Sequence, residues 1–557
     1  MSMSTPTSST SEYYNLGSHT RPISTTSGEA QIWFDRGLNW TYAFNHEEAI
    51  RCFRKALEHD PNCAMAHWGV AYAIGPNYNK EWDAFDEVDL KQSVATAHEE
   101  SQAALALVNR VTAAERGLIT AVQARFPAPV PAEDCAAWNE DYAAAMRAVY
   151  RDFSDDLDIA ALFAEALMNR TPWKLWNLKT GEAAEGASTL EAREVLERAF
   201  ENPSSRRHPG VLHMYIHLME MSPTPEAALR AADWLRGLVP DGGHLEHMST
   251  HIDVLCGHYQ NVVDWNSRAI EADRKYLARE GGMNFYTGYR AHNYHFKLYG
   301  AMFLGQYEAA VEAADELVAT IPNELFTIET PPMADWLEGF MSMKMHAYIR
   351  FGKWQEIIDT PLPEDEKLYC VTIAMIHYAK GVAYSATGRI AEAEEQRRLF
   401  DAAYERVPDT RMLFNNTCRD ILAIAREMLN GELEYRKGNY DVAYAHLRQA
   451  VELDDGLPYD EPWGWMQPAR HAYGALLLEQ GHFEEAEAVY RADLGFDSSL
   501  PRTYQHPENV WSLHGYHECL MRLGKHHFCP LIKQRLDLAI ARADVPIEAS
   551  CYCRMSA

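Results

Sequence analysis

The sequence predicts an all-α fold, built as a superhelical array of antiparallel helix pairs. Apolar residues recur with the period of amphipathic helices from about residue 28 to residue 540, and no stretch sustains the two-residue alternation of a strand. A helix–turn–helix pattern with a small residue at a fixed place also recurs along the chain. At 557 residues the chain is long for one compact core, which favours an array of units that each pack on their neighbours.

The first unit is EAQIWFDRGLNWTYAFNHEEAIRCFRKALEHDP, which has the pattern of a tetratricopeptide repeat, a helix–turn–helix of 34 residues. Gly37 is the small residue where the two helices touch, and Pro61 closes the unit. Small residues let helix backbones approach, and aromatic side chains fill the groove to the next unit. The expected packing residues are Trp33 and Trp40 on the first helix, and Ala49, Phe53 and Ala56 on the second.

Similar patterns surround Gly69, Gly381 and Gly474, so the array continues toward the C-terminus. The Ser- and Thr-rich start has no periodicity, and residues 1–27 are predicted to be a mobile polar tail. We expect N-terminal helices over residues 28–188, a central block over 189–327 and C-terminal helices over 328–557.

The net charge, the lack of targeting segments and the cysteines limit the classes of partner and the cellular location that we expect. With 51 basic and 80 acidic residues, the net charge of -29 argues against binding to nucleic acid or to anionic membranes. No signal-peptide pattern and no run of about twenty apolar residues is found, so we expect a cytoplasmic protein. The ten scattered cysteines favour reduced thiols, and Cys551 and Cys553 are expected on an exposed, flexible tail.

The central block carries a regular pattern of histidines. His213 and His217 are four residues apart, as are His247 and His251, so each pair occupies one face of a helix. The step from each member of the first pair to its counterpart is 34 residues, the period of the repeat. The pairs are therefore expected on neighbouring helices that line the concave surface, with His244 on the same face as the second pair.

His292 and His295 lie on the next predicted helix, after an insertion around LAREGGMN. Seven imidazoles on three adjacent helices predict a transition-metal site, because nitrogen ligands suit copper, iron or zinc better than magnesium or calcium. We favour copper or iron, keep zinc as a third option, and leave mononuclear and dinuclear sites open. The candidate catalytic or supporting residues are Glu220, Tyr286 and Tyr289.

Other patterns have simpler interpretations. HLEH does not match the zinc-protease motif H-E-x-x-H, and the lack of paired Glu-x-x-His motifs argues against a carboxylate-bridged di-iron bundle. His208, in HPG ahead of a helix, is expected to cap it. For GPNYN a turn is favoured over a substrate-contacting loop, and for TPWKLWN and YDEPWGWMQPARH interhelix packing is favoured over ligand stacking.

The chain resembles a family of large tetratricopeptide-repeat proteins of bacteria and fungi, most of them without an assigned activity. The resemblance is carried by HWGVAYAIGPNYN, by the block from HPGVLHMYIHLMEM to HLEHMSTHIDVLCGHY, by AHNYHF and by EPWGWMQPARHAYGALLLEQG. It covers nearly the whole chain after the tail and implies a shared histidine site without identifying a reaction. Thr250 stands where the family usually has proline, which we expect to relax a helix start without removing a ligand.

Two functions follow from these patterns. The first is a metal-dependent oxidoreductase with a small organic substrate and dioxygen as a candidate co-substrate, for which a zinc hydrolase or lyase is the variant on the same site. The second is a non-catalytic scaffold that binds a peptide partner in its concave groove, the usual role of such repeats.

Overall fold

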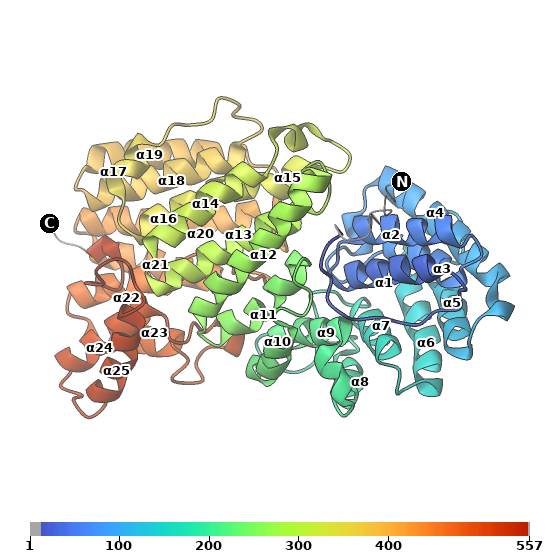
Figure 1. Cartoon of the computed structure of the whole chain (residues 1–557). Helices are drawn as coiled ribbons and strands as arrows, with labels where there is room; N and C mark the ends of the chain where they lie inside the picture. The colour runs from blue at the N-terminus through green and yellow to red at the C-terminus, as the bar shows by residue number, and fades with distance from the viewer. Residues whose placement is uncertain (1–12, 555–557) are drawn as a thin grey trace, which may run out of the picture.

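The computed structural model describes residues 13–554, and within this range the chain is almost entirely helical. Consecutive helices pack against each other along the chain, and Figure 1 shows them as antiparallel pairs running from one end of the molecule to the other. The predicted all-α array of helix pairs is confirmed. The three histidine-bearing helices belong to the middle of the array, between the N-terminal helices and the C-terminal ones.

The N-terminal part contains α1 (Gly28–Tyr42), α2 (His46–His59), α3 (Ala64–Ile74), α4 (Glu87–Ala106), α5 (Ala113–Arg125), α6 (Ala137–Asp152), α7 (Leu157–Met168) and α8 (Thr189–Ala199). The middle contains α9 (Pro209–Glu220), α10 (Leu229–Leu235), α11 (Gly243–Leu255), α12 (Tyr259–Glu280), α13 (Thr287–Leu304) and α14 (Tyr307–Thr320).

The C-terminal part contains α15 (Met333–Leu337), α16 (Met343–Arg350), α17 (Trp354–Asp359), α18 (Cys370–Ala386), α19 (Ile390–Tyr404), α20 (Cys418–Arg436), α21 (Tyr440–Asp455), α22 (Ala469–Glu479), α23 (Phe483–Asp493), α24 (Val510–Arg522) and α25 (Cys529–Ile540). A two-stranded hairpin, β1 (Met412–Leu413) and β2 (Asn416–Thr417), precedes α20. Short 3-10 helices cover Trp82–Ala84, Val108–Arg110, Pro203–Arg207, Pro225–Ala228, Asn323–Thr327, Glu338–Ser342, Arg502–Tyr504 and Tyr552–Arg554.

The first helix pair, α1 and α2, packs as its sequence predicts. A Cβ on Gly37 would lie 2.6 Å from the ring of Phe53, and a Cβ on Gly69 of α3 would meet the same ring at 2.6 Å. Phe53 is 1% exposed, so its ring fills the space that the two glycines leave between α1 and α3. The small residues are therefore required by the closeness of the helices, as expected for this repeat.

Residues 13–27 differ from the predicted mobile tail. The backbone N–H of Asn15 donates to Asp241 at 2.7 Å, and the guanidinium of Arg21 donates to Asp156 and Asp158 at 2.8 and 2.9 Å. Tyr14 is 7% exposed, so its ring is part of the N-terminal core. These contacts bind the segment across the helices; the remainder of the predicted tail, residues 1–12, lies outside the described residues.

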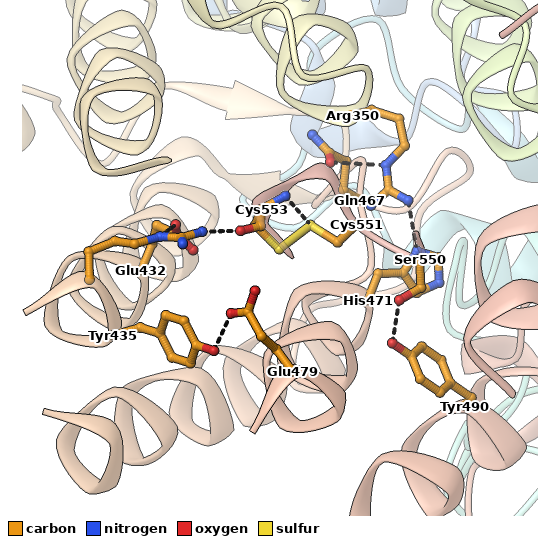
Figure 2. The surroundings of a disulfide bond; sticks show 11 residues. Arg350, Glu432, Tyr435, Gln467, His471, Glu479, Tyr490, Ser550, Cys551 and Cys553 are labelled. Carbon is orange, nitrogen blue, oxygen red and sulfur yellow. Dashed lines mark hydrogen bonds and ion pairs between the residues drawn. A yellow bond between two sulfur atoms is a disulfide. The ribbon is translucent and has the colours of Figure 1, made fainter. Parts of the chain in front are cut away.

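The C-terminus also differs from its prediction. Cys551 and Cys553 are buried and joined by a disulfide, and Figure 2 shows this bond among side chains of α16, α20, α22 and α23. Arg436 donates to the carbonyl of Cys553, and Ser550 is hydrogen-bonded to Tyr490. The segment is therefore packed rather than exposed, and the prediction of reduced thiols holds only for the other eight cysteines, which are free.

Within residues 13–554, no helix combines the length and the apolar composition needed to cross a membrane.

Candidate metal centre

Six of the seven predicted histidine ligands come together in the interior. α9 carries His213 and His217, α11 carries His244, His247 and His251, and α13 carries His292. α11 packs against both α9 and α13, while α10 and α12 form the connecting outer layer. The spacing of four residues on a helix and 34 residues between helices therefore brings the imidazoles to one place.

The histidines form two groups of three. In each group one potential ligand atom per residue lies within 4.8 Å of the other two. The first triad is His213, His217 and His244, in which Nε2 of His213 lies 3.1 Å from Nε2 of His244. All three side chains are at most 1% exposed.

The second triad is His247, His251 and His292. Nε2 of His247 lies 2.8 Å from Nε2 of His251, and the ring of His292 lies 4.6 Å from the ring of His247, centre to centre. The two triads are neighbours, because the ring centres of His244 and His247 are 5.8 Å apart. The arrangement offers room for one ion or for two.

Acceptors on the outer side of the rings fix the protonation of the imidazoles. Nδ1 of His213 donates to the carbonyl of Tyr42 at 2.7 Å, and Nδ1 of His217 donates to Glu220 at 3.0 Å. Because each of these bonds holds a proton on Nδ1, the Nε2 lone pair faces the cluster. Hydrogen bonds of this kind orient histidine ligands in metal sites.

His247 is also oriented by an acceptor at its Nδ1. Its Nδ1 lies 2.8 Å from the amide oxygen of Asn266, whose nitrogen donates to Thr250 at 3.1 Å and to the carbonyl of Val262 at 2.8 Å. The amide oxygen therefore has to accept from His247, which leaves the Nε2 lone pair pointing inward. Thr250 lies in the interior of α11 and not near a helix start, so the expected effect of its missing proline does not arise.

Several inward-facing nitrogens have no partner in the protein. Nε2 of His217 and Nδ1 of both His244 and His292 are buried and make no hydrogen bond. A buried polar atom without a partner is costly, and buried lone pairs that converge favour a bound cation. The donor set and its unpaired atoms therefore fit a nitrogen-ligated transition metal.

Glu220 lies between the two triads. One oxygen is 3.0 Å from Nδ1 of His217 and the other is 2.9 Å from Nδ1 of His251. Glu461, from the loop between α21 and α22, lies 2.8 Å from the same atom of His251. Burial alone would lower the pKa of His251, but the two carboxylates outweigh it and raise that pKa to about 10.

The other imidazoles are neutral. Burial, reinforced by the neighbouring imidazoles, lowers the pKa of His213, His244, His247 and His292 well below the usual value. Neutral imidazole is the form that binds a metal ion, so these residues need not lose a proton first.

Aromatic residues enclose the cluster. Phe44 stacks on His217 and His244 with ring centres 5.8 and 5.3 Å apart, and Tyr78 lies 4.9 Å from His217. Phe296 of α13 lies 4.9 Å from His247. These rings cover part of the cluster with apolar surface, which lowers the local dielectric and strengthens electrostatic interactions there.

The remaining predicted site residues lie at the edge of the histidine cluster or outside it. His295 is in neither triad, because its Nε2 faces the sulfur of Met466 at 2.9 Å. Tyr286 donates to Asp273 at 3.0 Å and accepts from the backbone N–H of His244 at 3.3 Å, so it supports α11. The ring of Tyr289 lies 4.9 Å from that of His244.

His208 caps α9, as predicted, because its Nδ1 accepts from the backbone N–H of Val211 at 3.2 Å. Its Nε2 lies 3.0 Å from Asp158, which also receives His19, Tyr42 and Arg21. Both oxygens of Asp158 thus have partners in the protein, which is typical of a structural network.

A cavity of about 240 Å³ adjoins the histidines. His244, His251 and His292 form part of its wall. Its other lining residues include Tyr78, Trp173, Phe285, Tyr289, Trp336, Phe340, Phe414, Asp460 and Glu461. A second cavity of about 430 Å³ shares four of the lining residues, Phe285, Tyr289, Met333 and Trp336.

Sequence reasoning missed several of these residues. Tyr78 and Trp173 belong to GPNYN and TPWKLWN, where a turn and interhelix packing were favoured, and both line the cavity. In YDEPWGWMQPARH the expected packing holds for Trp465, which is 2% exposed, whereas Glu461 reaches the histidines. Phe414 on the hairpin carried no signal at all, because only the folded chain brings it to the site.

A family model described as "Tetratricopeptide repeat" matches residues 30–63, which span α1, α2 and the turn after them. Residues 30–63 are thus similar to a tetratricopeptide repeat. The match ends before the histidine block, so it concerns the first helix pair and not the histidine triads. No curated protein matches the chain.

Among the solved structures that the chain resembles are the following three. Yeast Tom70 is 11% identical with a TM-score of 0.27, and the match covers 91% of this chain and 99% of Tom70. Ypp1 is 12% identical with a TM-score of 0.25, covering 95% and 89%. Naa15/Naa10 bound to HypK-THB gives 12% identity and a TM-score of 0.22, covering 92% and 70%. At these TM-scores the likenesses carry no argument about function.

Proposed function

We propose that this protein binds transition-metal ions in its two histidine triads and acts as a metal-dependent oxidoreductase on a small organic molecule. One observation carries the proposal: six buried imidazoles converge, and acceptors behind three of the rings direct their Nε2 lone pairs inward. Nε2 of His213 and Nε2 of His247 lie within hydrogen-bond distance of His244 and His251, whereas a hydrogen-bonded core would supply a donor to every such atom. Here Nε2 of His217 has no donor at all.

The nitrogen-rich donor set favours copper or iron, with zinc as the third option. A bound copper or iron ion would supply one-electron redox chemistry. The protein's own part is to hold the imidazoles in one orientation, to cover part of the cluster with the rings of Phe44 and Tyr78, and to place Glu220 between the triads. The cavity beside His251 and His292 supplies the place for the substrate.

The test is stoichiometric metal content, with a matched pair of variants on one helix. His292→Ala removes a member of the second triad, and His295→Ala removes a buried histidine three residues further along α13 that belongs to neither triad. We expect elemental analysis of the purified protein to give one or two equivalents of metal, reduced by His292→Ala and unchanged by His295→Ala. A visible absorption band that differs between air and its absence would indicate copper or iron over zinc.

Protein that holds no stoichiometric metal after incubation with copper, iron or zinc salts refutes the metal centre. Equal metal loss in both variants refutes the assignment of ligands. Stoichiometric zinc without a redox-active ion would favour the zinc hydrolase or lyase, in which the metal activates a water molecule.

The second candidate is a non-catalytic scaffold that binds a peptide, and the tetratricopeptide repeat over residues 30–63 favours it. Under this alternative the histidines are structural. A peptide-library pull-down whose hits bind equally well to wild-type protein and to the His292→Ala variant, in protein without metal, would support the scaffold.

A further inference from the structure

The last helix pair carries a large share of the exposed apolar side chains. Fourteen large apolar side chains are exposed within residues 13–554, and five of them lie between residues 521 and 540. They are Met521, Phe528, Leu531, Leu538 and Ile540. Figure 1 shows α24 and α25 at the end of the molecule away from α1 and α2. The terminal helices of a repeat array need a polar outer face to remain soluble, so this apolar end favours a partner.

α25 has two apolar sides, and the part of the chain that the structure describes covers only one of them. Ile532 and Leu536 are buried in the core, where α25 packs against α24. Phe528, Leu531 and Leu538, in contrast, are 58%, 59% and 67% exposed. Steps of three and seven residues place these three side chains along one side of the helix. We call them the α25 stripe.

The charged groups near the α25 stripe are matched within the chain. Four ion pairs involve α24, α25 and the turn between them: Lys533–Asp537, Arg535–Glu508, Arg522–Glu518 and Lys525–Glu487. This end is therefore close to neutral, although the whole chain has a net charge of -29. Two copies of so acidic a chain repel each other, and the repulsion is smallest where neutral surfaces face each other. An acidic peptide or an anionic membrane would gain little here, because these four cations already have carboxylate partners.

We propose that the α25 stripe is the contact between two copies of this chain, with the two α25 helices antiparallel across a two-fold axis. Leu531 then packs against the partner's Leu538, and the symmetry repeats this contact on the other side of the axis. Phe528 lies opposite the partner's Ala541, whose small side chain leaves room for the ring. The contact does not depend on the metal centre.

The size of the contact sets its strength. α25 has 12 residues, so it is about 18 Å long and about 10 Å wide with its side chains. Such a contact is smaller than a standard interface of about 800 Å² per copy, which predicts a weak dimer with a Kd on the order of 10 µM.

Light scattering of the full chain, at concentrations below and above about 10 µM, tests the proposal. The mass should rise from that of one chain toward that of two. Each leucine acts twice in a symmetric dimer, so Leu531→Ser combined with Leu538→Ser should raise the Kd at least about 100-fold. Both side chains are exposed, so the variant should fold. Leu190→Ser is the matched control, because Leu190 of α8 is 62% exposed, and it should leave the Kd unchanged.

A cross-linking variant locates the contact. Gln534, which is exposed, lies between the two leucines and close to the proposed axis, so Gln534→Cys should give a covalent dimer under mild oxidation. Leu190→Cys should give none. Added salt should strengthen the dimer, because it screens the repulsion between two chains of the same charge.

Four results would overturn the proposal. They are a wild-type protein that stays monomeric at every concentration, a dimer that survives the double leucine variant, a dimer that Leu190→Ser weakens equally, and a dimer that salt dissociates. Monomeric protein that binds phosphatidylserine vesicles through the two leucines would also overturn it, and would assign the stripe to a lipid surface instead.

Discussion

Replacing Glu220 by glutamine tests whether the two triads work as one centre. The carboxylate accepts from Nδ1 of His217 with one oxygen and contacts Nδ1 of His251 with the other. Gln is nearly the same shape, but it has a single acceptor oxygen and an NH₂ group. One of the two imidazoles must therefore face a donor with its own Nδ1–H.

The size of the effect follows from these contacts. Loss of a partner behind a histidine ligand costs about 10–100-fold in metal affinity, which is about 1.4–2.7 kcal/mol. The donor–donor contact should also lower the free energy of unfolding by about 1–3 kcal/mol, because Glu220 is fully buried. With only Glu461 left beside it, His251 should have a lower pKa than its value of about 10.

Metal affinity is measured by competition with a chromophoric chelator, and stability by chemical unfolding of metal-free protein. Glu246→Gln is the matched control, because Glu246 is a buried carboxylate on α11 whose electrostatic partners are Arg268, Asp241 and Arg236 rather than triad histidines. We expect this control to keep its metal affinity. Wild-type affinity in Glu220→Gln, or an equal loss in Glu246→Gln, would refute the bridging role of Glu220.

Three further predictions concern the scaffold and are measured by unfolding in denaturant. Phe53→Ala should cost about 3–5 kcal/mol, because its ring fills the space left by two glycines; a loss below about 1 kcal/mol would contradict this packing. Asp158→Asn should lower the free energy of unfolding by about 3 kcal/mol, because it leaves buried Arg21 with one carboxylate instead of two. The exposed Asp409→Asn is the control and should lower it by almost nothing. Equal losses in the two variants would refute the stabilising role of the Arg21–Asp158 ion pair. Burial raises the pKa of Asp454 to about 7, above its unfolded value, so its contribution to the free energy of unfolding is full below about pH 4 and is lost as the pH rises to about 7. Asp454→Asn should therefore make the free energy of unfolding fall less steeply over this pH range. An unchanged pH dependence would contradict the raised pKa of Asp454.

The helices and the ligand-bearing faces could be predicted because their signals are local. The period of apolar residues marks the helices, and the small residue at Gly37 marks a close helix crossing. The spacing of the histidines placed His213 and His247 at equivalent positions on neighbouring helices, and in the structure they belong to adjacent triads. His295 was grouped with the others because it shares a helix with His292, but its Nε2 faces the sulfur of Met466, which the sequence spacing does not reveal.

The chain ends were predicted less well. Low hydrophobicity and the lack of periodicity indicated a mobile tail, yet Arg21 and Asn15 are held by Asp158 and Asp241, which are far away in the sequence. The C-terminal Cys-x-Cys has no local feature that shows it is buried and bonded to Arg436 of α20, more than a hundred residues earlier. Contacts between residues that are far apart in the sequence cannot be predicted from the pattern of a short segment.

The sequence by itself determined the all-α class, the helix pairs and six of the seven histidines that come together, because the direction of a side chain in a helix depends on its spacing. Only the tertiary structure decided that these histidines divide into two triads joined by Glu220, and that Glu461 and Phe414 reach them from a distant loop and a hairpin. The physical reason is that loops have no periodicity: their positions are set by long-range packing, and the charge and shape of this site depend on them.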